Sequence, residues 1–391
     1  MKVMVTNAEY KHALAAIRSL GRRGIEVVST SQFEHAQGFY SRYSKKRFVS
    51  PPPTTEAKYI KFIRSTAMKE KIDVILPVGF NSIYAISGCL EKLSDFKIPI
   101  PPREKVRAVS NKWEAMMLAR KEGVPIPVTV LIENASDPDL KGLEHPVVVK
   151  GDEGSGFHSY CNTPSQTRLE IKKLKKLYFG NGNEHGSIIV QEYIFGKGYG
   201  HFSLLNHGAV KAFFQHKRLR EFPISGGSAT KAESILDKKL KRYGESMLRS
   251  LKWHGVAMVE FKKDERDNEF KLMEINPKFW GSLALSIRCG VDFPYLAAQM
   301  AYTGDIKKAG AYKTGVRYRW LFPDDTLHLL SNPKILPSYL CDCLNPGIGS
   351  DIQITDPLPT TIQFGNTILQ LKRVREDRKR RLPDKRGESN K

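Results

Sequence analysis

KLMEINPKFWGS, residues 271–282, reads as one short strand that carries two polar side chains and then stops at a proline. Side chains two positions apart on a strand point to the same face, so Glu274 and Asn276 project together, away from the apolar residues beside them. Pro277 has no backbone N–H to donate to a neighbouring strand, which makes it a natural end of the pairing. The stretch therefore predicts a strand whose last residues present a carboxylate and an amide side by side.

The residues before this strand complete a hairpin. In VAMVEFKKDERDNEFKLMEINP, residues 256–277, the polar cluster DERDN predicts the turn. With the turn centred on Asp267, Glu260 faces Glu274 with Cβ atoms about 5 Å apart, an arrangement in which like charges repel. A divalent cation turns that repulsion into attraction, and Mg²⁺ prefers carboxylate and amide oxygens. Glu260, Glu274 and Asn276 are therefore the predicted metal ligands. A register that differs by one or two residues stays open, and it would leave one glutamate exposed on an edge strand.

A lysine followed by glycines marks a second candidate site. Within HPVVVKGDEGSGFHSY, residues 145–160, the apolar run ends at Lys150, and the residues of interest after it are Gly151, Gly154, Ser155 and Gly156. Glycines let backbone N–H groups approach phosphate oxygens, and a lysine adds positive charge. The chain has no GxxxxGK[ST] sequence, which disfavours a P-loop enzyme. An ordinary turn after a strand explains the same pattern.

Two arginines alternate along a third stretch, HKRLREFPISGGSAT (216–230). Arg218 and Arg220 are expected on one face of a strand, where guanidinium groups suit the bidentate binding of carboxylate or phosphate. A solvated basic strand is the alternative.

Composition narrows the class of protein. The 391 residues are 40% hydrophobic and 27% charged, as in a soluble globular protein of two or three domains. No apolar run is long enough for a membrane span, no secretion signal is expected at the first residues, and five scattered cysteines predict reduced thiols and a cytoplasmic protein. The formal net charge of +22 favours anionic ligands. Residues 372–391 are strongly basic, which predicts either a solvated, disordered tail or a segment that binds nucleic acid.

The first hundred residues alternate strand and helix patterns. KVMVT, IEVVSTS and IDVILPV are separated by amphipathic stretches, which predicts βαβ units and a parallel sheet. The first turn, VTNAEYKHAL, contains no glycine, so a standard dinucleotide site is not expected there. This part is expected to be Rossmann-like in shape only.

Taken in order along the chain, these features resemble the ATP-grasp superfamily, particularly its carboxylate–amine ligase branch and the ATP-binding part of carbamoyl phosphate synthase. The resemblance spans roughly residues 1–305 and is carried by VVVKGDEGSG, VQEYIFG and MVEF…LMEINPKFWGS. It implies an α/β, Rossmann-like pre-ATP-grasp domain, then an α+β ATP-grasp fold of two subdomains and a small C-terminal extension. The expected parts are 1–105 for the α/β domain, 106–186 for the glycine-loop subdomain, 187–310 for the metal-site subdomain, 311–371 for the extension and 372–391 for the tail.

The resemblance also assigns roles to residues. Lys112 and Lys150 match the family's phosphate-contacting lysines, and Glu260, Glu274 and Asn276 match its metal ligands. The hinge that holds adenine in the family corresponds to Gln191, Glu192, Tyr193 and Ile194. Two departures stand out: Lys278 replaces an arginine that could bind in bidentate fashion, and no carboxylate stands near Gly198 to hold the ribose.

The implied activity is an ATP-dependent ligase with Mg²⁺ or Mn²⁺, in which a carboxylate is activated as an acyl phosphate and captured by an amine. Arg218, Arg220 and Lys278 are expected to grip the transferring phosphoryl group or the acceptor carboxylate. The expected partners are a small-molecule carboxylate and an amine, with no membrane partner, and a homodimer is left open. The alternatives are an ATP-dependent carboxylase or carbamoyl-phosphate-type enzyme, and a nucleic-acid-binding protein on a nucleotide-binding scaffold.

Overall fold

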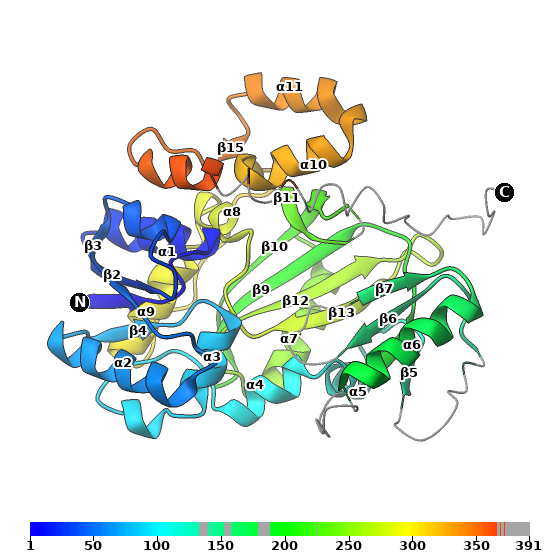
Figure 1. The fold of residues 1–391 in the computed structure, drawn as a ribbon, viewed down its shortest axis with the longest axis horizontal. Coiled ribbons are helices and arrows are strands. Elements are labelled where there is room, and N and C mark those ends of the chain that lie inside the picture. The colour runs from blue at the N-terminus through cyan, green and yellow to red at the C-terminus, as the bar shows by residue number, and fades with distance from the viewer. Residues whose placement is uncertain are drawn as a thin grey trace. The chain divides into compact units, whose positions relative to one another are not determined.

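A computed structural model describes residues 1–132, 140, 142–151, 158–178, 188–224, 226–365, 368 and 371 (Figure 1). The chain divides into two compact units. The first combines Met1–Val106, Gly200–Met258 and Asn276–Arg380, and the second combines Arg107–Tyr199 with Val259–Ile275, together with Arg381–Lys391, which lies outside the described residues.

The first unit begins with a four-stranded parallel sheet. Its strands are β1 (Lys2–Val5), β2 (Glu26–Ser31), β3 (Ser44–Val49) and β4 (Val74–Leu76), in the order β3-β2-β1-β4. Between and after them run α1 (Lys11–Arg22), α2 (Glu56–Lys69), α3 (Phe80–Ser87) and α4 (Arg103–Ser110). The observed alternation agrees with the βαβ pattern of the sequence, because parallel neighbours need a crossover between them.

A larger sheet of mixed direction has the order β13-β12-β9-β10-β11-β14-β15. Its members are β9 (Gly198–Asn206), β10 (Ala209–Phe222), β11 (Ser228–Ser234), β12 (Gly255–Lys263), β13 (Phe270–Asn276), β14 (Arg317–Arg319) and β15 (Gly349–Ser350). His207 and Gly208, both at positive φ, make the turn between β9 and β10 that the NHG sequence predicts. The associated helices are α7 (Lys238–Ser250), α8 (Leu283–Arg288) and α9 (Phe293–Thr303).

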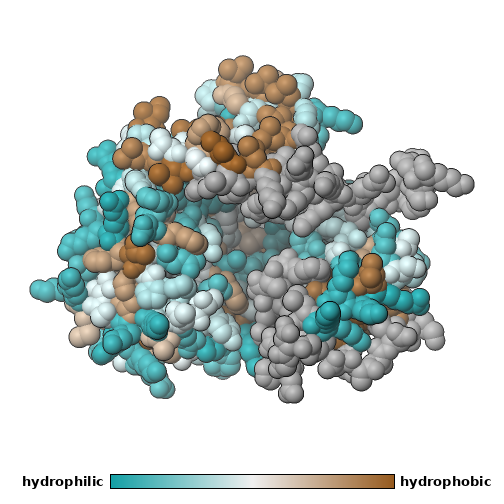
Figure 2. Space-filling model, viewed as in Figure 1, coloured by the Kyte–Doolittle hydropathy of each residue, from teal (hydrophilic) through white to brown (hydrophobic). Residues whose placement is uncertain are grey.

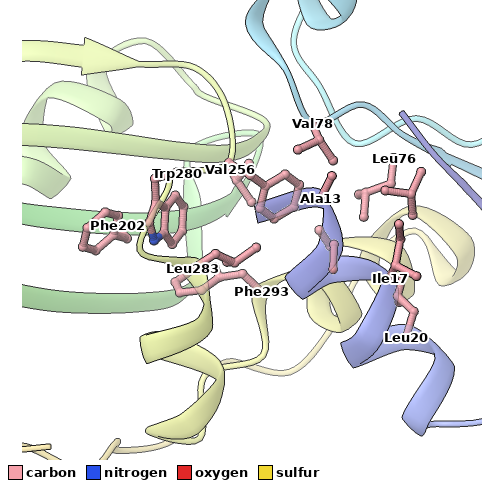
Figure 3. Close-up of a cluster of buried hydrophobic side chains, with 14 of the residues drawn as sticks. Ala13, Ile17, Leu20, Leu76, Val78, Phe202, Val256, Trp280, Leu283 and Phe293 are labelled. Atoms are coloured by element: carbon pink, nitrogen blue, oxygen red, sulfur yellow. The ribbon is translucent and has the colours of Figure 1, made fainter. Parts of the chain in front are cut away.

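The core of the first unit lies where α1 meets the sheets (Figure 3). Phe202 packs on Trp280 with ring centroids 4.3 Å apart, and Trp280 meets Phe293 edge-on at 4.9 Å. The same cluster includes Ala13, Ile17, Leu20, Leu76, Val78, Val256 and Leu283. Because α1 places its apolar residues three and four positions apart, one face of the helix is buried along its length.

The second unit holds an antiparallel sheet in the order β5-β8-β6-β7. These strands are β5 (Thr129–Ile132), β6 (Val147–Gly151), β7 (His158–Cys161) and β8 (Ile188–Glu192), accompanied by α5 (Lys112–Lys121) and α6 (Pro164–Tyr178). Asn111 caps α5, since its side chain accepts a hydrogen bond from the Glu114 N–H at 2.9 Å.

The C-terminal part of the first unit is mostly helical. It consists of η3 (Leu321–Asp325), α10 (Thr326–Ser331), η4 (Pro333–Ile335), α11 (Leu336–Leu344) and a helical segment at 358–365. Within the described part of the chain, no helix is long and apolar enough to span a bilayer.

Candidate functional site

The DERDN cluster forms the turn between β12 and β13, as the sequence predicts. The Asp264 N–H donates to the Glu269 carbonyl at 2.8 Å, and the Asn268 N–H donates back to the Asp264 carbonyl at 2.8 Å. Asn268 has φ of 59°, a left-handed conformation that asparagine tolerates. These bonds close the turn and hold Asp264 beside Asn268 and Glu269. The predicted opposition of Glu260 and Glu274 lies further along the two strands and stays a prediction.

Glu260 and Glu274 both act on Lys150 of β6. The pKa of the Lys150 amine is lowered to about 8, chiefly by burial. Among its charged neighbours, Glu274 and Glu260 raise this pKa, whereas Lys112 and Lys262 lower it. Electrostatic interactions weaken with distance, so these four side chains lie within reach of one amine. At pH 7 that amine still carries its proton. The second unit thus gathers three lysines and two glutamates, all contributed by β6, α5 and the β12–β13 hairpin.

Gln191 and Gly151 position the two predicted phosphate-binding lysines. Lys150 Nζ donates to Gln191 Oε1 at 2.6 Å, and Gln191 Nε2 donates to Thr129 Oγ1 at 3.0 Å. The Gln191 residue is only 1% exposed, and its side chain orients Lys150, a contact that the sequence did not predict. Lys112 Nζ donates to the Gly151 carbonyl at 3.0 Å, which places the first turn of α5 beside the end of β6. Gly154, Ser155 and Gly156 lie outside the described residues.

The predicted hinge, residues 191–194, begins in the last two residues of β8. It contacts the turn of the β12–β13 hairpin. Glu192 Oε2 accepts from the Val128 N–H at 3.1 Å, and Glu192 also pairs with Arg266 of the turn. Tyr193 packs edge-on against Phe195 with centroids 4.8 Å apart. The Ile194 side chain is buried, and no described residue accepts a hydrogen bond from its N–H. That backbone donor is the kind of group that reads an adenine edge.

Lys262 is a member of this site that the sequence-based prediction missed. Its Nζ donates to the Ile194 carbonyl at 3.1 Å and lies 4.6 Å from the centre of the Tyr193 ring. Lys262 stands two positions after Glu260 on β12, so the alternation of a strand already puts both on one face. The two-residue spacing from Glu260 is therefore the pattern from which the sequence could have predicted Lys262 as a member of this site.

Asn276 and Lys278 belong to the first unit, at and just beyond the end of β13. Lys278 influences His12 of α1: burial lowers the pKa of the imidazole well below its usual value, and Lys278 and Lys11 lower it further. Neither ring nitrogen of His12 has a hydrogen-bond partner among the residues that the structure describes. Lys11 is paired with Asp324 and lies 5.0 Å from the centre of the Trp320 ring. Lys278 therefore lies near a neutral histidine that no sequence pattern singled out.

The predicted role of Arg220 is corrected. Its guanidinium is bound by Asp325 Oδ2 at 3.1 Å and by Asp342 Oδ2 at 2.7 Å, with Ser338 Oγ at 3.0 Å. These partners all lie in the C-terminal part of the chain, so Arg220 fastens that part to β10. A β-bulge between Arg218 and Arg220 breaks the alternation that predicted a shared face.

Arg218 has different surroundings from Arg220. Its Nη1 donates to the Gly227 carbonyl at 2.9 Å and lies 3.4 Å from Glu221 Oε2. The two arginines thus do not act as one anion-binding pair.

Substituting Arg220 by leucine should destabilise the protein. Asp325 is fully buried and Asp342 nearly so, and an uncompensated buried charge costs about 3–5 kcal/mol. Urea denaturation measures the loss. Arg317→Leu is the matched control, because Arg317 is 54% exposed and surface ion pairs are worth about 0–1 kcal/mol. Equal effects of the two substitutions would contradict the structural role of Arg220.

The predicted metal ligands have suitable chemistry. Two carboxylates and one amide offer only oxygen donors, the type that Mg²⁺ and Mn²⁺ prefer. In the described part of the chain, no group of three or more His, Cys, Asp and Glu side chains is placed to hold a metal, so a site here needs the Asn276 oxygen.

Part of this chain matches a family of known proteins. Residues 187–322 match the family described as ATP-grasp in the biosynthetic pathway with Ter operon. Urea amidolyase of Lachancea kluyveri is 25% identical over 198 residues, 46% of this chain and 10% of that protein. Urea amidolyase of Saccharomyces cerevisiae is 25% identical over 291 residues, 68% of this chain and 15% of that protein. The chain thus spans only a small part of these relatives.

Solved structures show the same fold. N5-carboxyaminoimidazole synthetase from Staphylococcus aureus aligns with a TM-score of 0.62 at 17% identity, covering 81% of this chain and 80% of that one. L-amino acid ligase from Bacillus licheniformis aligns with a TM-score of 0.60 at 16% identity, covering 77% and 74%. Biotin carboxylase from Campylobacter jejuni aligns with a TM-score of 0.61 at 17% identity, covering 81% and 74%. Residues 187–322 therefore match an ATP-grasp family, and the chain has the ATP-grasp fold.

Proposed function

We propose that this protein is an ATP- and Mg²⁺-dependent ligase that joins a carboxylate to an amine. The observation that carries the proposal is the convergence of Glu260, Glu274 and Lys112 on the buried amine of Lys150. A buried lysine next to two carboxylates has no evident structural purpose. It suits a site that takes up a polyphosphate and its cation together.

Each side chain has a part in this proposal. Lys112 and Lys150 bind the phosphates of ATP, and Gln191 keeps the Lys150 ammonium pointed at them. The hinge at Glu192–Ile194 receives the adenine, whose ring nitrogen accepts from the Ile194 N–H. Mn²⁺ is an alternative occupant of the metal site, because its ligand preferences overlap those of Mg²⁺.

Glu260, Glu274 and Asn276 would hold the metal ion. When bound, Mg²⁺ neutralises charge on the β- and γ-phosphates. The two glutamates also balance the lysines, so the site stays close to neutral before ATP enters. Lys278, just beyond Asn276, would bind an anionic group of the substrate.

The proposed reaction has two steps. The substrate carboxylate oxygen attacks the γ-phosphorus of ATP and ADP leaves, which gives an acyl phosphate. The nitrogen of a neutral amine then attacks the acyl carbon, phosphate leaves, and the amine loses its proton, which forms the amide. Positioning and charge neutralisation supply most of the catalysis, so no side-chain nucleophile is required. The named activities of L-amino acid ligase and N5-carboxyaminoimidazole synthetase motivate this reaction class.

The test is a screen for ADP release with Mg²⁺ across amino acids, dicarboxylates, amines and bicarbonate. ADP release that requires both a carboxylate and an amine supports the ligase. Dependence on bicarbonate alone would instead favour a carboxylase, the activity named for the biotin carboxylase neighbour. No nucleotide binding in the presence of Mg²⁺ would contradict both.

Gln191→Met should raise the KM for ATP about tenfold or more, with a smaller change in kcat. A hydrogen bond to a charged group is worth about 1.5–3 kcal/mol, and without it the Lys150 ammonium is less well oriented. Steady-state kinetics measure the change. Gln299→Met on α9 is the control, since no hydrogen bond of the Gln299 side chain is seen among the described residues. Unchanged kinetics in Gln191→Met would argue against a positioning role.

A further inference from the structure

His12, in the first turn of α1, is a polar side chain that the fold leaves unsatisfied. Both of its ring nitrogens are buried, and neither has a hydrogen-bond partner among the described residues. Nearly all buried polar groups in proteins are hydrogen-bonded, so an exception of this kind needs an explanation. A ligand that bonds to the imidazole is one such explanation, and the surroundings of His12 show which kind of ligand would fit.

The nearest charge without a partner is Lys278. This lysine is half-buried and forms no ion pair with any carboxylate that the structure describes. Hydrophilic side chains cover much of the surface in Figure 2, drawn in teal, as expected of charges that stand in water. Other partly or fully buried lysines of the first unit are each paired with a carboxylate; they are Lys2, Lys11, Lys211 and Lys231. Lys278 therefore favours an anionic ligand.

The hydrophobic core fixes His12 and Lys278 in place. Their neighbours in the chain, Ala13 and Phe279, are 0% and 1% exposed and belong to one buried cluster, in which Figure 3 shows Ala13. The His12 ring also stacks on Tyr10, with centroids 5.1 Å apart. Burial is the main cause of the lowered pKa of His12, and Lys278 lowers it further, so the two groups lie near each other.

The loop after β13 lies directly against the start of α1. An added Cβ at Gly281 would stand 2.9 Å from Lys11 Cε, so the loop contacts the first residue of the helix. The Lys11 ammonium is itself paired with Asp324. Of the two lysines beside His12, Lys278 is thus the one whose charge no described carboxylate balances.

The start of α1 adds backbone donors to the same place. The first N–H groups of a helix have no partner within the helix, and the side chain of the N-cap residue Tyr10 does not accept from them. Among the described residues, no group accepts a hydrogen bond from the N–H of Lys11 or of His12. The helix dipole favours negative charge at this end. Side chains and backbone therefore call for the same kind of ligand, an oxyanion.

The order of the parallel sheet also marks this position. The chain leaves β1 through α1 to β2 on one side and later reaches β4 on the other, in the order β3-β2-β1-β4. Open α/β sheets bind ligands beyond the carboxyl ends of their strands, where the order reverses in this way. The Gly79 N–H, three residues after β4, donates to Asn7 Oδ1 at 2.9 Å, so the segments after β1 and β4 meet there.

We propose that His12 and the first N–H groups of α1 form, together with Lys278, the binding site for the carboxylate substrate. The inference rests on the proposed ligase function, in which a carboxylate must be held while it is activated. The Lys278 ammonium pairs with the carboxylate, and a ring N–H of His12 donates to one of its oxygens. Inorganic phosphate offers the same charge and acceptors, so the experiment must separate the two anions.

The first test needs no ATP. Imidazole ¹⁵N–¹H correlation spectra of the full chain are recorded with sodium acetate, sodium succinate or sodium phosphate, with sodium chloride at equal ionic strength as the reference. The His12 signals are assigned by their loss in His12→Phe. They should shift saturably with acetate or succinate. A response to phosphate alone, or the same response to chloride, would overturn the carboxylate site.

Lys278→Met tests the charge with the same signals. The half-saturating concentration of acetate or succinate should rise about tenfold or more, because a hydrogen bond to a charged group is lost. Lys278→Arg keeps the positive charge and should bind close to the wild-type level. Unchanged binding by Lys278→Met would overturn the proposal.

His12→Phe tests the imidazole by kinetics, with a carboxylate that supports ADP release. The KM for this carboxylate should rise about tenfold while the KM for ATP stays unchanged, since one donor to a charged group is removed. His254→Phe is the matched control, because His254 is also half-buried and stacks on His207 with centroids 4.3 Å apart. It should change neither constant. An unchanged KM for the carboxylate in His12→Phe, or an equal rise in both constants, would contradict the role of His12.

The two proposals fail in different experiments. If no carboxylate and amine support ADP release, the ligase is wrong, and the spectra recorded without ATP still decide whether the start of α1 binds a carboxylate. If ADP release is found but acetate and succinate leave the His12 signals unmoved, the ligase stands and this site is wrong.

Discussion

Replacing Glu274 by glutamine is expected to lower the rate of ATP turnover roughly a thousandfold while the fold is retained. The substitution keeps the size of the side chain and removes one of the negative charges that the proposed metal site requires. Because Glu274 also acts on the charged amine of Lys150, its loss leaves three lysines balanced by Glu260 alone. ADP release under saturating Mg²⁺ measures the effect.

Glu265→Gln is the control for Glu274→Gln, because Glu265 is an exposed residue of the same hairpin turn. It should leave turnover and melting temperature unchanged. In the Glu274 variant, a higher Mg²⁺ concentration for half-maximal activity would place the defect at the metal site. Wild-type ADP release by Glu274→Gln would remove the basis of the proposed function.

Lys150→Met is expected to lower kcat/KM for ATP by about three orders of magnitude, comparable to the loss of a charge that acts in the transition state. Methionine preserves the apolar stem and removes the ammonium that would bind phosphate. Since burial disfavours the charged amine, as its lowered pKa of about 8 indicates, the variant should not unfold more readily than the wild type. Kinetics with varied ATP and a thermal denaturation scan measure the two effects.

Lys121→Met at the last turn of α5 is the control for the Lys150 substitution, since it removes one exposed charge of the same type. It should leave both kinetics and stability unchanged. A Lys150→Met protein with normal ATP kinetics would show that this amine does not face the phosphates. Lost activity together with a large drop in stability would mean that Lys150 is structural.

Several features of the molecule were accessible from sequence because they depend on neighbours along the chain. The βαβ alternation of the first hundred residues, the turn at His207–Gly208 and the DERDN hairpin are all local patterns. Lys150 lies next to the last residue of β6 and Asn276 is the last residue of β13. Both positions follow from local patterns too, the apolar run before Lys150 and the proline after Asn276. The backbone conformation of the turn was not accessible, since it includes a left-handed residue, Asn268, that no sequence pattern singled out.

The roles of individual charged side chains were decided by contacts across long sequence distances. The sequence predicted Arg220 as an anion-binding residue. In the structure its guanidinium pairs with Asp325 and Asp342, which lie more than one hundred positions later in the chain. Gln191 was predicted as part of the hinge, and only the structure showed that its side chain binds Lys150 on a neighbouring strand.

The sequence alone therefore determined the strand–helix alternation of the first hundred residues, the hairpin and the residue types available for ATP chemistry. Only the tertiary structure decided which of those charges are already paired. The reason is physical: backbone periodicity depends on residues a few positions apart, whereas the partner of a charge depends on which distant segment packs beside it.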